Sequence, residues 1–95
     1  MSDPVLEELF DVIEQRKANR PADSYTAELL DHEKGENAVL EKLGEELTEV
    51  VLAAKDGNDE ALTSESADLV YHLLVLLSLH ELRLEDLLAE LRARR

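Results

Sequence analysis

The sequence contains no cysteine and no tryptophan, and very few aromatic residues of any kind: Phe10, Tyr25 and Tyr71. Without cysteine there can be no disulfide bond, no catalytic thiolate and no cysteine-ligated zinc site. With so few rings, leucine, valine and alanine must fill the core, which suits helices. The hydrophobic fraction of 44% is too high for a disordered chain. The composition therefore predicts one small domain over residues 1–95.

Basic residues are also scarce. Lysine and arginine total 10 against 23 acidic residues, so the formal net charge is −13. That charge repels nucleic acids and anionic membrane surfaces, and neither is expected as a partner. The excess of acid suggests adaptation to a high-salt cytoplasm, where screening weakens the repulsion between carboxylates. An acidic protein from an ordinary cytoplasm fits the same composition.

Long apolar runs are missing as well. The longest, from Leu69 to Leu79, contains His72 and Ser78 and is too short to cross a bilayer. The first residues, Met1 to Pro4, lack the basic and apolar regions of a secretory signal. We therefore expect a soluble protein with a cytoplasmic location.

Apolar residues recur at helical spacing along most of the chain, and no segment alternates like a strand. Helices are expected from about residue 4 to 20, 24 to 30, 38 to 55, 59 to 80 and 84 to 91. Pro4 and Ser24 suit helix starts, whereas Pro21, Gly35 and Gly57 suit the breaks. The two long helices on either side of Gly57 should form an antiparallel hairpin. The expected fold class is an all-α helical bundle built round that hairpin.

The first long helix carries three glutamates near its middle. At about 100° per residue, Glu45, Glu46 and Glu49 fall in one sector with Lys42, beside the apolar stripe rather than opposite it. Glu46 and Glu49 are three residues apart, so their carboxylates can converge on one ion. Taken alone, this sector is more typical of an ordinary solvated helix face than of a metal site.

The second long helix carries Glu65 and Asp68, again three residues apart, on a largely apolar face. A carboxylate there is costly unless it is neutralised or finds a cation. The Gly57 turn can bring both acids opposite Glu46 and Glu49. Hard oxygen ligands suit Mg²⁺, with Mn²⁺ as a substitute, and a phosphate-bearing substrate would complete the coordination. The two clusters together make a metal site about as well supported as a merely solvated surface.

Histidine does not supply a rival metal site. A carboxylate-bridged di-iron bundle uses Glu-x-x-His motifs, but leucine stands three residues before each histidine of this chain. His72 lies one turn beyond Asp68. It is interpreted as a buried structural residue, with a hydrogen bond behind the metal ligands as the alternative.

The acidic motifs Glu45-Glu46-x-x-Glu49 and Glu65-x-x-Asp68 together resemble the signature of the all-α nucleoside-triphosphate pyrophosphatases, which include MazG-type enzymes and dimeric dUTPases. Further blocks resemble the phosphoribosyl-ATP pyrophosphatase family of histidine biosynthesis, over nearly the whole chain. They are Ser24-Tyr25-Thr26-Ala27, Glu41-Lys42-Leu43-Gly44 and Ala67-Asp68-Leu69-Val70-Tyr71-His72. A departure is Glu81-Leu82-Arg83, where that family more usually has Gly-Leu-Ser.

This resemblance implies Mg²⁺-dependent hydrolysis of the small-molecule nucleotide phosphoribosyl-ATP to phosphoribosyl-AMP and pyrophosphate. It implies Glu46, Glu49, Glu65 and Asp68 as metal ligands, and Glu45 as a further ligand or as the base that orients water. The substrate-binding residues that we expect are Arg16, Ser24, Tyr25, Thr26, Lys42 and Lys55. For each cation among them, a plain surface charge is the alternative.

A homodimer is also expected. The helix from Ala67 to Leu79 is apolar around almost its whole circumference, more than so small a chain can cover. A two-fold copy would bury the remainder. Two other functions stay open. A housecleaning nucleoside-triphosphate pyrophosphatase shares the acids but not the Ser24-Tyr25-Thr26 block. A non-enzymatic acidic helical interaction module uses its carboxylates only for solubility and predicts no metal dependence.

Overall fold

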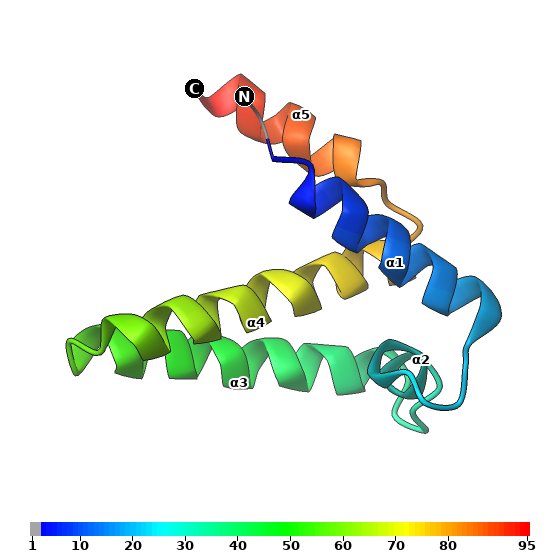
Figure 1. Cartoon of the computed structure of the whole chain (residues 1–95), viewed down its shortest axis with the longest axis horizontal. Helices are drawn as coiled ribbons and strands as arrows, with labels where there is room; N and C mark the ends of the chain where they lie inside the picture. Colours follow the sequence, from blue (N-terminus) through cyan, green and yellow to red (C-terminus); the bar gives the residue numbers. More distant parts are fainter. Residues whose placement is uncertain (1–2) are drawn as a thin grey trace.

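The computed structural model describes residues 3–95, which form five α-helices and no strand (Figure 1). The helices are α1 (Val5–Asn19), α2 (Tyr25–Leu30), α3 (Glu36–Lys55), α4 (Asp59–Leu79) and α5 (Leu84–Arg94). The prediction of an all-α fold is confirmed. Predicted and observed helix boundaries differ by no more than about three residues, the usual uncertainty of helix ends.

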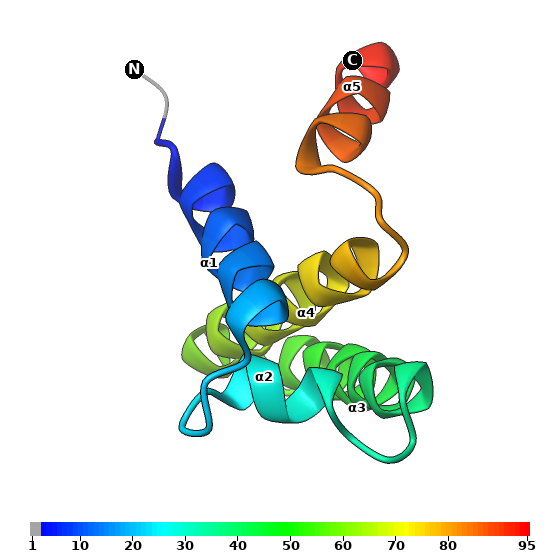
Figure 2. The same cartoon turned by 90° about the vertical axis from the view of Figure 1, so that its right-hand side faces the viewer.

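The two longest helices, α3 and α4, lie side by side and antiparallel, as both views show (Figures 1 and 2). A tight turn joins them. Gly57 takes a φ of +67°, a conformation that costs a residue with a side chain more than glycine. Asn58 then caps α4, because its Oδ1 accepts a hydrogen bond from the Ala61 N–H at 3.0 Å. The predicted hairpin and its cap are therefore present.

The hydrophobic core lies at the open end of this hairpin, where α1 and α2 pack against the start of α3 and the end of α4. Its buried members come from all five helices: Phe10, Ile13, Leu29, Leu30, Ala38, Val39, Leu74, Val75 and Leu84. Ser24 caps α2 by accepting a hydrogen bond from the Ala27 N–H at 3.2 Å. The core fixes one end of the hairpin, and the turn end projects from it (Figure 1).

Polar contacts tie α1 to the end of α4. Lys17 Nζ donates a hydrogen bond at 2.8 Å to the Ser78 carbonyl in the last turn of α4, which also accepts one from the Glu81 N–H at 3.0 Å. The Ser78 hydroxyl, fully buried, donates to the Glu14 carboxylate at 2.7 Å. Lys17 is thus partly buried and holds a helix end.

The connection from α4 to α5 contains a strained residue. Glu81 has a φ of +58°, in the left-handed region that favours glycine. This is the position where the resembling family more usually has glycine, so the backbone geometry explains that preference. The missing serine cap of α5 is compensated from the other side, because Asp86 Oδ2 accepts a hydrogen bond from the Arg83 N–H at 2.8 Å.

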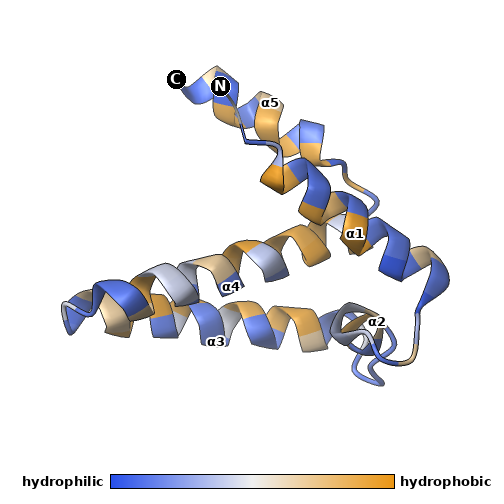
Figure 3. Ribbon diagram, viewed as in Figure 1, coloured by the Kyte–Doolittle hydropathy of each residue, from blue (hydrophilic) through white to orange (hydrophobic). Residues whose placement is uncertain are grey.

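Much of the apolar surface of α3 and α4 is not covered within one chain. Apolar residues concentrate in the second half of α4 (Figure 3), yet Val70 is 41% exposed and Leu73 37%. On α3, Leu47 and Val51 are each more than half exposed. One chain therefore leaves part of the apolar surface of α4 exposed, as expected from the sequence.

Helix α4 is also long and apolar enough to cross a membrane, by length and composition alone. The core helix of a soluble protein passes the same test, so this property is weak evidence. Glu65 and Asp68 stand in the middle of α4, where an apolar bilayer would oppose their charge. Their surroundings in the hairpin give them a different role.

Candidate active site

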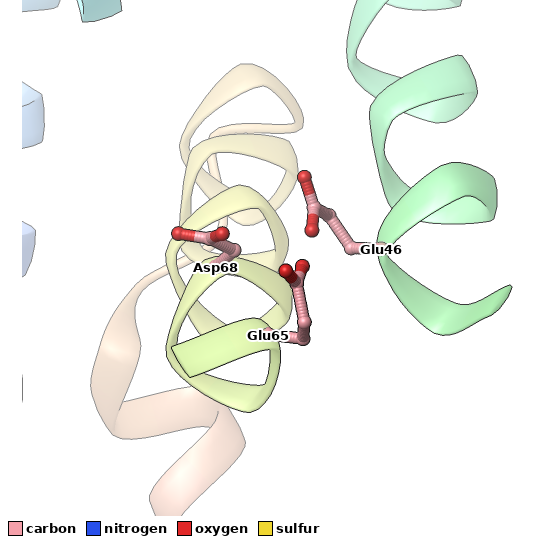
Figure 4. Close-up of side chains that lie close together, drawn as sticks. All are labelled: Glu46, Glu65 and Asp68. Atoms are coloured by element: carbon pink, nitrogen blue, oxygen red, sulfur yellow. The ribbon is translucent and has the colours of Figure 1, made fainter. Parts of the chain in front are cut away.

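Three carboxylates meet at the middle of the hairpin. Glu46 points from α3 toward Glu65 on α4, and Asp68 lies one turn further along α4 (Figure 4). One carboxylate oxygen of each lies within 4.8 Å of the others. Glu46 and Glu65 are partly buried and Asp68 is exposed, so the group is open to solvent on one side. Three hard oxygen ligands at this spacing fit a divalent cation such as Mg²⁺ or Mn²⁺.

The electrostatics of this group favour bringing in positive charge. The pKa of Glu65 lies above its usual value, first because its carboxyl shares a hydrogen bond with Glu46. Partial burial and the negative charges of Glu46 and Asp68 raise the pKa of Glu65 further. The cluster therefore holds a proton more readily than an isolated glutamate does, and a cation would relieve the same repulsion.

Removing this charge should stabilise the metal-free protein. Because the pKa of Glu65 is raised by folding, its protonated form adds to the free energy of unfolding. This contribution is fully present below the ordinary pKa of 4.5 and is lost as the pH rises through the raised pKa. At pH 7, in a chelating buffer, we therefore expect Glu65→Gln to raise the melting temperature by a few degrees. Below pH 4 the difference should vanish. Glu33→Gln, which removes an exposed charge from a turn, is the control for the general effect of net charge. Equal gains in both variants would contradict the prediction.

The structure does not bring every predicted ligand into this group. Glu49 is exposed, one turn from Glu46 toward the Gly57 turn, and is not among the three clustered acids. With Glu45 and Thr48 it lines a shallow hollow on the outer side of α3. Glu45 also forms an ion pair with Lys42, with 3.6 Å between Oε2 and Nζ. In this side-chain conformation Glu49 is not part of the acidic group.

A pocket of about 280 Å³ opens between α2 and α3, and Glu45, the neighbour of Glu46 in sequence, is among its lining residues. Tyr25, Lys42 and Glu45 line it, and partial burial raises the pKa of the Tyr25 hydroxyl while the positive charge of Lys42 opposes this shift. Its volume is close to the lower end of the range for small-molecule sites. Two of the predicted substrate-binding residues, Tyr25 and Lys42, thus share one pocket with a predicted catalytic residue.

The rest of the Ser24-Tyr25-Thr26 block is used differently. Ser24 is engaged as the cap of α2, and Thr26 is buried, with its hydroxyl hydrogen-bonded to that of Tyr71. Neither residue lines the pocket between α2 and α3. In this conformation both side chains support the local fold and leave Tyr25 to face the pocket.

Arg16 and Lys55, the two remaining predicted contacts, lie away from this pocket. Lys55 ends α3, nine residues after Glu46, which places it about 14 Å further along the helix axis. Arg16 is in the last turn of α1 and does not line the pocket. A second hollow, of about 420 Å³ between α1 and the α4–α5 connection, contains neither residue.

Two residues that were not among the predicted site residues lie beside the site. His72 is 5% exposed and contacts both the Asp68 backbone and the Tyr25 hydroxyl. Tyr71 packs its ring against both Tyr25 and His72. The burial expected for His72 is therefore present, and a hydrogen bond joins its ring to the turn that carries Asp68. The spacing of Asp68 and His72, one helical turn, was the available signal.

Comparison with known proteins agrees with this arrangement. The family described as phosphoribosyl-ATP pyrophosphohydrolase matches residues 6–95. A phosphoribosyl-ATP pyrophosphatase of Haloarcula marismortui is 69% identical over 96% of this chain and 93% of its own length. That of Halobacterium salinarum is 62% identical over the full length of both chains. That of Pelotomaculum thermopropionicum is 54% identical over 96% of this chain and 91% of its own length.

Proposed function

Because the chain belongs to the phosphoribosyl-ATP pyrophosphohydrolase family, we propose that it hydrolyses phosphoribosyl-ATP to phosphoribosyl-AMP and pyrophosphate. This is a step of histidine biosynthesis, and we place the enzyme in the cytoplasm. The cofactor that we propose is Mg²⁺, with Mn²⁺ as a substitute. Glu46, Glu65 and Asp68 hold the ion, and Glu49 joins them by a change of rotamer.

The convergence of Glu46, Glu65 and Asp68 in the middle of the hairpin is the observation that carries this proposal. These acids would repel a polyphosphate, as would the net charge of −13. Only a cation between them and the substrate makes the acidic pocket suitable for an anionic ligand. When bound, Mg²⁺ neutralises charge on the phosphoryl oxygens and supports attack by water. The fixed helices supply the positioning.

Other pocket residues have separate tasks. Lys42 lines the pocket, where it offers a positive charge to the substrate's phosphates. Glu45 is exposed, close to both Lys42 and the pocket, where it can orient the attacking water or serve as a further ligand. In this assignment water hydrolyses the phosphoanhydride bond between the α- and β-phosphates, and pyrophosphate is the leaving group.

We also propose that the enzyme is a homodimer. The exposed apolar residues of α3 and α4 form the interface, and a closed two-fold contact leaves none of them free. Arg16 and Lys55, which lie away from the pocket of their own chain, then reach the substrate bound by the neighbouring chain. The paired hairpins would give each acidic group a wall that a single chain lacks.

An assay on three substrates tests the function. We expect the purified protein to release pyrophosphate from phosphoribosyl-ATP when Mg²⁺ is present and to lose that activity in a chelating buffer. ATP and dUTP should be hydrolysed far more slowly. Preference for ATP or dUTP would instead favour the housecleaning function, and absence of any metal-dependent hydrolysis would favour the non-enzymatic interaction module.

A further inference from the structure

The hydrogen-bond directions around His72 can be worked out from its two partners. Its Nδ1 lies 2.8 Å from the Asp68 carbonyl oxygen, and its Nε2 lies 3.0 Å from the Tyr25 hydroxyl oxygen. A carbonyl oxygen only accepts, so Nδ1 carries the hydrogen. In the neutral ring Nε2 is then an acceptor. The Tyr25 hydroxyl must therefore donate its one proton to His72.

This bond fixes how Tyr25 can act on a ligand. Its hydroxyl has no proton left to give to a phosphate, and partial burial raises the pKa of the phenol, so the hydroxyl stays protonated. The His72 ring stands edge-on to the Tyr25 ring, at 5.9 Å between centroids and 89° between planes. Yet Tyr25 as a whole is 48% exposed and lines the pocket. What it offers a ligand is the accessible part of its ring.

We propose that the Tyr25 ring is the platform on which the planar base of the substrate stacks, and that His72 is the positioning residue that holds this platform in place. The proposal rests on the proposed function for the presence of a nucleotide. The geometry places the platform in the same pocket as Lys42, which can meet a phosphate of the same ligand. Aromatic stacking suits a purine base because every base has a π-face.

His72 also links the platform to the acids. One ring nitrogen is hydrogen-bonded to the Asp68 backbone and the other to Tyr25. His72 therefore fixes the position of α2 relative to the turn of α4 that carries a proposed metal ligand. The distance between the stacked base and the acids is then set by a single buried side chain. No proton transfer by His72 is needed for this role.

Tyrosine NMR tests the platform without using activity. The chain has only two tyrosines, so ring-labelled protein should give two sets of signals, which a Tyr71→Phe variant assigns. AMP should shift the Tyr25 ring signals saturably, and ribose 5-phosphate, which has no base, should not. If AMP leaves Tyr25 unshifted while the protein hydrolyses phosphoribosyl-ATP, stacking is refuted. If AMP shifts Tyr25 but phosphoribosyl-ATP is not hydrolysed, only the proposed function fails.

Kinetics separate the platform from its support. Tyr25→Leu should raise KM for phosphoribosyl-ATP by about 10- to 100-fold, with kcat within about 2-fold, because it removes binding and leaves the acids intact. Tyr25→Phe keeps an aromatic ring at position 25, and His72→Phe keeps the Tyr25 ring itself, but each variant loses the hydrogen bond between Tyr25 and His72. Each should therefore raise KM about 5-fold. His80→Phe, which replaces an exposed histidine that does not line the pocket, is the control and should leave KM unchanged.

The double variant Tyr25→Phe/His72→Phe decides whether His72 acts through Tyr25. Its KM should be no higher than that of the worse single variant, since both remove the same bond. If the two increases multiply, or if His72→Phe lowers kcat with KM unchanged, the positioning role is wrong. If His72→Phe fails to fold, Tyr25→Phe and the AMP titration test the positioning role instead. A Tyr25→Phe variant with unaltered KM and an unaltered response to AMP would show that the hydrogen bond has no such role.

Discussion

Asp68→Asn should reduce kcat/KM for phosphoribosyl-ATP by about 100- to 1,000-fold, the range seen when one preorganised electrostatic group is removed from an active site. The amide keeps the size of the side chain but loses the charge that, with Glu46 and Glu65, attracts the ion. Circular dichroism should show unchanged helix content, because Asp68 is exposed and outside the core. Isothermal titration should show weaker Mg²⁺ binding in parallel with the lost activity.

The control for this substitution is Glu60→Gln. It removes the same charge from an exposed position on the same helix, eight residues away, where it is not in the acidic group. Its activity should stay within about 2-fold of the parent, as is usual for surface changes. An Asp68→Asn variant that works normally at limiting Mg²⁺ would remove Asp68 from the metal site.

Glu49→Gln, measured in the same way, tests whether Glu49 is a metal ligand although it lies outside the acidic group in this conformation. We expect a loss comparable to that of Asp68→Asn, since one change of rotamer brings its carboxylate to the ion. Weak binding of Mg²⁺ by this variant would support the assignment. Normal binding together with normal activity would limit the ligands on α3 to Glu46.

The second large effect concerns assembly. Light scattering at high salt and micromolar concentration should give about twice the single-chain mass of 10.7 kDa. Leu47→Glu/Val51→Glu should convert this dimer to a monomer, because both residues are more than half exposed on α3 and would lie in the interface. Each substituted side chain should weaken the free energy of dimerisation by roughly 1 kcal/mol or more, and a dimer contains four of them. The dissociation constant should therefore rise by about 1,000-fold or more.

Val5→Glu is the matched control, since Val5 is as exposed as Leu47 but begins α1, away from the hairpin. That variant should remain dimeric. Activity of the hairpin variant should fall with the loss of dimer if Arg16 and Lys55 act across the interface. A parent protein that is monomeric and fully active at micromolar concentration would refute the dimer and the shared site together.

The helices and their ends could be predicted from sequence because local signals specify them. Ser24 was identified as a cap from residue type and position, and it makes the expected hydrogen bond. For α4 the sequence allowed Asn58 or Asp59 as the cap, and Asn58 makes the bond. Gly57 marked the hairpin turn, which in turn placed Glu65 and Asp68 opposite the first acidic cluster. The family resemblance then gave the function that the comparisons support.

What could not be predicted depends on side-chain conformation and on packing between distant segments. The helical wheel put Glu46 and Glu49 in one sector, but only a structure shows which of them faces α4. Tyr25 and His72 are 47 residues apart, and nothing local indicates that they meet. Thr26 was predicted to contact substrate as part of a motif, whereas its burial and its bond to Tyr71 depend on how α2 packs on α4.

The short turn between α3 and α4 has a consequence for the order in which the protein folds. Glu46 and Glu65 are only 19 residues apart, so closing the loop between them costs little chain entropy compared with a contact across a larger loop. Topologies dominated by such near-neighbour contacts fold fast, in microseconds to milliseconds. The repelling carboxylates therefore come together early, before α1 and α2 have covered the core. Mg²⁺ in the refolding buffer should speed the folding of the hairpin, and a chelator should slow it.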